Sequence, residues 1–103
     1  MDEKRKHKRI KKGIRSEVHS TEGVTFSVST DLSHGGIFIS TPEPVRDGSQ
    51  VDLCVYIPGE EPVEMKGVIR WTRQEEQGGQ KTGMGIEFLN PSKKELETIK
   101  KAL

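Results

Sequence analysis

The chain has 103 residues, of which 30% are hydrophobic and 32% are charged, and its formal net charge is +1. This length suits one domain and is too short for two, and the low apolar content requires a small core. The single cysteine excludes an internal disulfide, and the three scattered histidines predict no metal site. No apolar stretch approaches the length of about 20 residues that a membrane span needs, and no signal peptide opens the chain. We therefore expect a soluble cytoplasmic protein without membrane insertion.

The charge is distributed unevenly along the chain. Residues 1–20 hold eight Lys/Arg against three Asp/Glu, a net charge of +5, whereas residues 21–103 hold nine against thirteen, a net charge of −4. A basic arm on a mildly acidic body predicts an anionic partner, and a merely solvated tail is the alternative. We expect a flexible basic arm over residues 1–12 and a single folded domain over residues 13–103.

Polar and apolar residues alternate with the two-residue period of β-strands from Gly13 onward. Clusters of turn-forming residues interrupt this pattern repeatedly. Gly67 lies inside one alternating segment and predicts a bend or bulge there. Most of the aromatic residues fall at positions that predict a buried face. The expected strands cover residues 14–19, 24–30, 37–40, 51–57, 63–72 and 84–88.

The C-terminal segment differs from the rest. Ser92 and Glu95 have the spacing of a capping box, and Leu96, Ile99 and Leu103 follow at helical intervals. A helix of about ten residues would be marginal alone and needs the body of the protein. The elements together predict an all-β fold, a small antiparallel barrel or sandwich with a short C-terminal α-helix.

Two short motifs carry the functional prediction. Arg5 and Arg9 form R-x-x-x-R in the basic arm, and Asp31, Ser33 and Gly36 form D-x-S-x-x-G at a turn between strands. Two guanidinium groups can grip phosphate oxygens or the guanine O6/N7 edge. A carboxylate can accept from guanine N1 and N2, and a hydroxyl adds a polar contact. Each motif alone also fits a plain explanation, since charged tails and Asp/Ser turns are common.

Both motifs in this order resemble the PilZ domain family. The resemblance continues through residues 36–41, which read Gly-Ile-Phe-Ile-Ser-Thr, and through residues 67–71 and 83–88. It covers nearly the whole chain. It implies a six-stranded antiparallel β-barrel that binds the bacterial second messenger cyclic di-GMP.

The resemblance also implies site residues. Arg5 and Arg9 would contact guanine and phosphate, Asp31 and Ser33 would take polar guanine contacts, and Gly36 would shape the turn. No other cofactor is implied. The ligand would order the arm across the barrel and offer a changed surface to an unidentified downstream protein.

Three further residues are candidates for ligand binding: Lys4, Gly35 and Trp71. Lys4 precedes the first arginine, where a basic residue in the family often accompanies two stacked ligand molecules. Lysine cannot stack or fork as arginine does, so one and two ligand molecules both remain open. Trp71 lies where family members often line the pocket.

Other function classes remain beside the receptor. An adaptor of the same fold could bind proteins and no nucleotide, and a basic arm with a small barrel could hold single-stranded nucleic acid. Against the latter, the aromatic residues are expected mostly in the core. We expect no enzyme and no catalytic residues, because the sequence offers no nucleophile with its base and orienting group.

Overall fold

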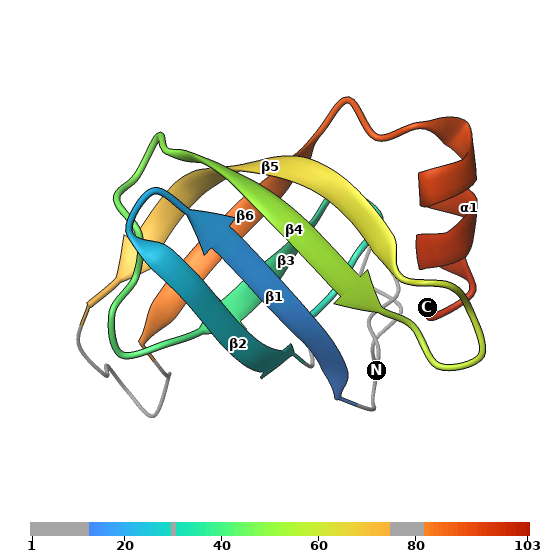
Figure 1. The fold of residues 1–103 in the computed structure, drawn as a ribbon, viewed down its shortest axis with the longest axis horizontal. Helices are drawn as coiled ribbons and strands as arrows, with labels where there is room; N and C mark the ends of the chain where they lie inside the picture. The colour runs from blue at the N-terminus through green and yellow to red at the C-terminus, as the bar shows by residue number, and fades with distance from the viewer. Residues whose placement is uncertain (1–12, 30, 75–81) are drawn as a thin grey trace, which may run out of the picture.

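The computed structural model describes residues 13–29, 31–74 and 82–103. Six antiparallel strands follow one another and a short helix ends the chain, as the sequence predicted (Figure 1). The elements are β1 (Ile14–Ser20), β2 (Gly23–Ser29), β3 (Gly36–Ser40), β4 (Gln50–Tyr56), β5 (Val63–Arg73), β6 (Gly83–Leu89) and α1 (Lys93–Lys100). The expected arm over residues 1–12 lies outside the described residues.

The strands form one sheet in the order β2-β1-β4-β5-β6-β3, which curls into a nearly closed barrel (Figure 1). Serine side chains join its two edge strands. Ser27 Oγ donates to the carbonyl of Ser40 at 3.2 Å, and Ser29 Oγ donates to the carbonyl of Phe38 at 2.7 Å. The barrel is therefore closed between β2 and β3 by hydroxyl groups that reach the carbonyls of the opposite strand.

The core comes from the inward faces of the strands and from one turn of α1. Leu32, Ile39, Val55 and Ile99 have no exposed surface. The predicted capping box is present, since Ser92 Oγ accepts from Glu95 N at 3.0 Å and Glu95 Oε1 accepts from Ser92 N at 2.8 Å. This cap begins α1 where Ile99 can enter the core beside β5.

The apolar face of β2 points to solvent, although alternation alone would have suggested burial. The two-residue turn between Ser20 and Gly23 fixes the register, and Gly23 has the φ of +132° that this turn needs. Ser16 and Val18 of β1 face inward, so their β2 partners Ser27 and Thr25 do too. The side chains left outside are Val24, Phe26 and Val28.

The expectation that most aromatic residues lie in the core is wrong. Phe88 is buried, whereas Phe26 and Trp71 are exposed and Phe38 and Tyr56 are half-buried. No bulge lies at Gly67, and the register shift in β5 falls between Ile69 and Trp71 instead. Gly67 lies in regular register with both neighbouring strands, and its missing side chain makes room for Ile86 and Leu53, which a Cβ would meet at 2.5 and 3.0 Å.

Candidate ligand-binding site

The D-x-S-x-x-G segment forms a tight turn that leads into β3. The carbonyl of Asp31 accepts from Phe38 N at 3.0 Å, Leu32 pairs with Ile37, and Ser33 N donates to the carbonyl of Gly36 at 2.9 Å. Such a ladder folds the segment back on itself. The turn therefore holds Asp31 opposite Phe38, at the start of the seam between β2 and β3.

The side chain of Ser33 serves the turn itself. Its Oγ accepts from Gly35 N at 3.3 Å and lies 3.4 Å from the carbonyl oxygen of Gly36. Asp31, Gly35 and Gly36 line a neighbouring cavity, and Ser33 is not among its lining residues. Ser29 Oγ accepts from Asp31 N at 3.1 Å, so the buried seam serine also anchors the backbone of the motif aspartate.

Gly36 is required by the closeness of β6. Its Cα lies opposite Glu87, and a Cβ there would lie 2.3 Å from the carbonyl oxygen of Ile86. Among the glycines that the structure describes, those with a positive φ are Gly23, Gly48 and Gly59, so no unusual φ explains Gly36. Only a residue without a side chain lets the turn approach this strand.

A β-bulge in β5 places Trp71 at the site. Alternation put Trp71 on the same buried face as Ile69, but the register with β6 shifts between these two residues. The extra residue, Arg70, reverses the side on which Trp71 emerges. Ile69 is 1% exposed and Trp71 is 43% exposed. Trp71 is therefore not a core residue, contrary to the buried position that alternation predicts for it.

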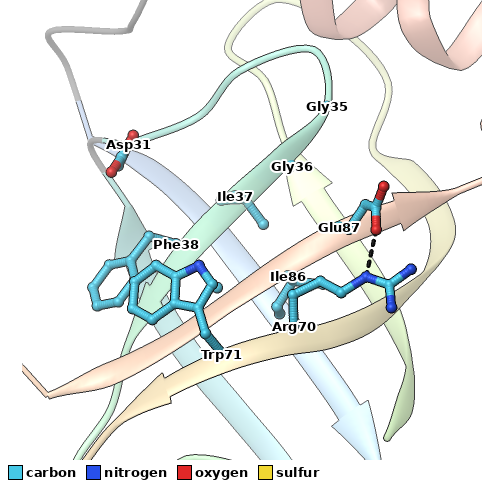
Figure 2. A pocket seen from close by; sticks show the side chains of 10 residues that line it. Asp31, Gly35, Gly36, Ile37, Phe38, Arg70, Trp71, Ile86 and Glu87 are labelled. Atoms are coloured by element: carbon cyan, nitrogen blue, oxygen red, sulfur yellow. Dashed lines mark hydrogen bonds and ion pairs between the residues drawn. The ribbon is translucent and has the colours of Figure 1, made fainter. Parts of the chain in front are cut away.

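Trp71 and Phe38 form an aromatic pair on the outside of the barrel (Figure 2). Their ring centroids are 5.3 Å apart and the ring planes differ by 18°. The guanidinium of Arg73 lies over both rings, 5.2 Å from the centroid of Trp71 and 5.5 Å from that of Phe38. An exposed indole with a cation beside it offers a stacking surface for a nucleobase.

The cavity beside this pair has a volume of about 230 Å³. Arg70 and Glu87 form its other wall, with Nε and Oε1 2.5 Å apart (Figure 2). Both side chains are more than half exposed, so this ion pair contributes only about 0–1 kcal/mol to stability and can open to meet a ligand. The cavity thus combines a carboxylate, an aromatic face and a cation.

Sequence reasoning missed several residues of the site. The bulge that turns Trp71 outward leaves no mark on the alternation of polar and apolar residues. One available signal was the Gly-x-Gly pair in β6, because glycine inside a strand often marks a close approach. The residues missed are Phe38, Arg70, Arg73, Gly85 and Glu87.

The structure brings together four of the predicted residues, Asp31, Gly35, Gly36 and Trp71, as cavity lining. Lys4, Arg5 and Arg9 lie outside the described residues, so their contribution remains a prediction. Within residues 13–29, 31–74 and 82–103, no group of His, Cys, Asp or Glu is arranged to hold a metal ion. None of the helices in that same part of the chain has the length and apolar character needed to cross a membrane.

The fold and the cavity define a small six-stranded barrel with a hollow at one strand turn. The sequence model of the PilZ domain matches residues 3–103. The chain belongs to the PilZ domain family, which confirms the family suggested by its motifs. No curated protein sequence matches the chain significantly.

Solved structures share this fold. The inhibitor of motility MotI/DgrA from Bacillus subtilis superimposes with a TM-score of 0.77 at 17% identity, over 97% of this chain and 49% of that protein. The present chain thus spans about half the length of MotI/DgrA. The PilZ domain of YcgR from Escherichia coli, solved with c-di-GMP, superimposes with a TM-score of 0.67 at 17% identity, over 95% of this chain and 87% of that one.

The PilZ domain of CeSA from a cellulose-synthesizing bacterium gives a TM-score of 0.61 at 19% identity, over 91% of this chain and 92% of that one. At such identities the likeness to the three structures is one of fold.

Proposed function

We propose that this protein is a receptor for cyclic di-GMP. The observation that carries the proposal is the placement of Asp31, Gly36 and Trp71 around one cavity, although they come from different parts of the chain. In this arrangement the Asp31 carboxylate accepts from the guanine edge. Trp71 offers its exposed face to a base, and the close turn at Gly36 leaves room for the ligand.

The arm completes the site in this proposal. The cavity of about 230 Å³ is smaller than the 300–1,000 Å³ or so of ordinary ligand pockets, so a dinucleotide would extend beyond it over the surface. Arg5 and Arg9 supply the cations for its two phosphodiesters and for the guanine edge. Charge-assisted hydrogen bonds of about 1.5–3 kcal/mol each offset an ordering cost of about 1–2 kcal/mol per residue.

The role of the protein is to signal by binding rather than by catalysis. Ligand binding draws residues 1–12 across the barrel, and the rearranged surface is what a downstream protein recognises. Residues 1–12 thus link the binding of a small anionic ligand to the binding of a protein partner.

Titration with cyclic di-GMP tests the proposal, with calorimetry and the fluorescence of the single tryptophan as readouts. We expect binding at micromolar ligand or below. Arg5→Ala, Arg9→Ala and Asp31→Ala should each weaken it by about 2–5 kcal/mol, which is about thirtyfold or more. Lys66→Ala is the matched control, because Lys66 pairs with Asp52 in an exposed ion pair away from the cavity. A wild-type protein that gives no heat and no fluorescence change would refute the receptor function.

A salt series separates the receptor from a nucleic-acid binder. The outward position of Trp71, Phe38 and Arg73 would also suit a single strand. Two phosphodiester contacts give a shallow dependence of affinity on salt, whereas many give a steep one. We expect a shallow slope with cyclic di-GMP and much weaker binding of a deoxythymidine 12-mer. Tight, steeply salt-dependent binding of the 12-mer would favour the other function.

A further inference from the structure

An apolar strip covers the outer face of β2. The strip consists of Val24, Phe26 and Val28, which are 48%, 72% and 60% exposed. The register with β1 keeps these side chains outside, so the strip is built into the hairpin. Contiguous apolar side chains on a soluble protein usually mark an interaction surface.

A hollow of about 310 Å³ lies beside the strip. Phe26 and Val28 form one side of it and Arg15, Glu17 and Tyr56 form the other. The Arg15 guanidinium lies 5.4 Å from the centroid of the Tyr56 ring, and the Tyr56 hydroxyl donates to Glu17 Oε2 at 2.8 Å. A protruding phenyl ring and a hollow of aromatic and apolar character thus share one face.

The charged and apolar residues on this face are arranged symmetrically about one point. Arg15 lies opposite Val28 and Glu17 lies opposite Phe26, and the pair Ser16 and Ser27 lies between them. A two-fold axis perpendicular to the strands at this serine pair exchanges the positions of Arg15 and Glu17. The same axis exchanges the positions of Phe26 and Val28. The face is therefore complementary to itself, as a symmetric dimer interface must be.

We propose that the outer face of the β1–β2 hairpin binds a second copy of this chain. In this dimer the two hairpins lie face to face and antiparallel. Phe26 of each copy enters the hollow of the other beside the partner's Val28, and Arg15 of each copy meets the partner's Glu17. One apolar contact and one ion pair are thus each made twice by one small patch.

Other occupants fit this face less well. The basic arm over residues 1–12 holds seven Lys/Arg and only two apolar residues, Met1 and Ile10, so it does not match an apolar strip. A nucleic-acid strand would meet Glu17, Asp52 and Glu64 on the outer faces of β1, β4 and β5. A second copy in the antiparallel orientation, by contrast, places a carboxylate against Arg15 and a guanidinium against Glu17.

Sedimentation velocity of the full chain, over a range from micromolar to near-millimolar concentration, tests the dimer. We expect wild type to dimerise and Phe26→Ser to raise the dissociation constant tenfold or more, since aromatic residues at interface centres dominate binding. Arg15→Glu should dissociate the dimer because two pairs of like charges then meet. Arg15→Glu combined with Glu17→Arg should restore it, since the swap recreates both ion pairs. Lys66→Glu is the control for charge reversal on the neighbouring strands and should leave the dimer intact.

Circular dichroism establishes that each variant is folded, and Phe26→Ser, at a highly exposed position, provides a test that does not depend on the charge swap. A wild type that stays monomeric throughout the range, or a dimer that Phe26→Ser leaves unchanged, would overturn the proposal. Cyclic di-GMP titration of Phe26→Ser separates this result from the receptor function, because the strip lies outside the ligand cavity. Loss of dimerisation with ligand binding retained supports both proposals.

Discussion

The indole of Trp71 lies directly against the backbone of Gly85, its cross-strand partner on β6. A Cβ built on Gly85 would be 2.2 Å from Trp71 Nε1 and 2.3 Å from Cε2. The bulge at Arg70 turns the indole outward, and the bare backbone of Gly85 then lets it lie flat beside Phe38. The orientation of the proposed stacking surface thus depends on a glycine that contributes no side chain of its own.

Replacing Gly85 with alanine should displace the indole while leaving the barrel intact. The added methyl group overlaps the ring, but Trp71 is 43% exposed and can swing toward solvent. We expect a stability loss at the lower end of the range of about 1–3 kcal/mol for overpacking, with a red-shifted tryptophan emission and weaker cyclic di-GMP binding. Urea unfolding and fluorescence measure these effects. A variant with unchanged emission would show that the indole of Trp71 does not pack against Gly85.

Gly36 and Gly35 provide a matched pair of adjacent glycines. A Cβ on Gly36 would meet the carbonyl oxygen of Ile86 at 2.3 Å, and backbone cannot move aside as a side chain can. A Cβ on Gly35 has no heavy atom within 4 Å. We expect Gly36→Ala to lose about 1–3 kcal/mol of stability and Gly35→Ala to stay within about 0.5 kcal/mol of wild type. Equal losses in urea unfolding would show that β6 does not constrain Gly36.

The sequence was most informative where local chemistry decides the structure. The capping box of α1 and the turns between strands follow from residues close together in the chain, such as Ser92 and Glu95. The D-x-S-x-x-G turn was predicted for the same reason. Alternation located all six strands because each strand turns one face toward the core. In β2 that inner face is polar.

The parts that sequence reasoning missed depend on contacts between distant segments. A period of two does not show which face of a strand is buried. In β2 the turn at Gly23 sets the register, which places the serine side chains inside the barrel and the apolar side chains outside. The bulge at Arg70 is likewise set by pairing with β6. These two features put Phe26 and Trp71 on the surface, where they define both proposed binding faces.

The pKa of the Glu17 carboxyl is lowered by the hydrogen bond from Tyr56 and, to a smaller extent, by the contact with His19. Tyr56→Phe should therefore raise the pKa of Glu17. Because the pKa of Glu17 is lower in the folded than in the unfolded protein, the stabilisation is complete above the unfolded pKa and is lost as pH falls through the folded one.

Wild type should consequently have a higher free energy of unfolding than Tyr56→Phe at neutral pH, and this difference should shrink below about pH 4. Carbon-detected NMR titration of the Glu17 carboxyl measures the pKa, and urea unfolding at pH 7 and pH 3 measures the difference. His19→Ala should raise the same pKa less. If the stability difference between wild type and Tyr56→Phe instead grew as the pH falls, a group other than Glu17 would control the pH dependence.

Ser29 connects the closure of the barrel to the ligand cavity. This serine is 3% exposed, donates to the carbonyl of Phe38 at 2.7 Å and accepts from Asp31 N at 3.1 Å. Ser29→Ala leaves two backbone groups without this partner and should cost about 1–3 kcal/mol of stability. It should also weaken cyclic di-GMP binding, because Asp31 loses one of its anchors. Ser27→Ala removes a single bond at 3.2 Å from a half-buried position, so we expect a smaller stability loss and unchanged affinity. If both variants lose affinity equally, closure of the whole seam, rather than the anchoring of Asp31, controls the site.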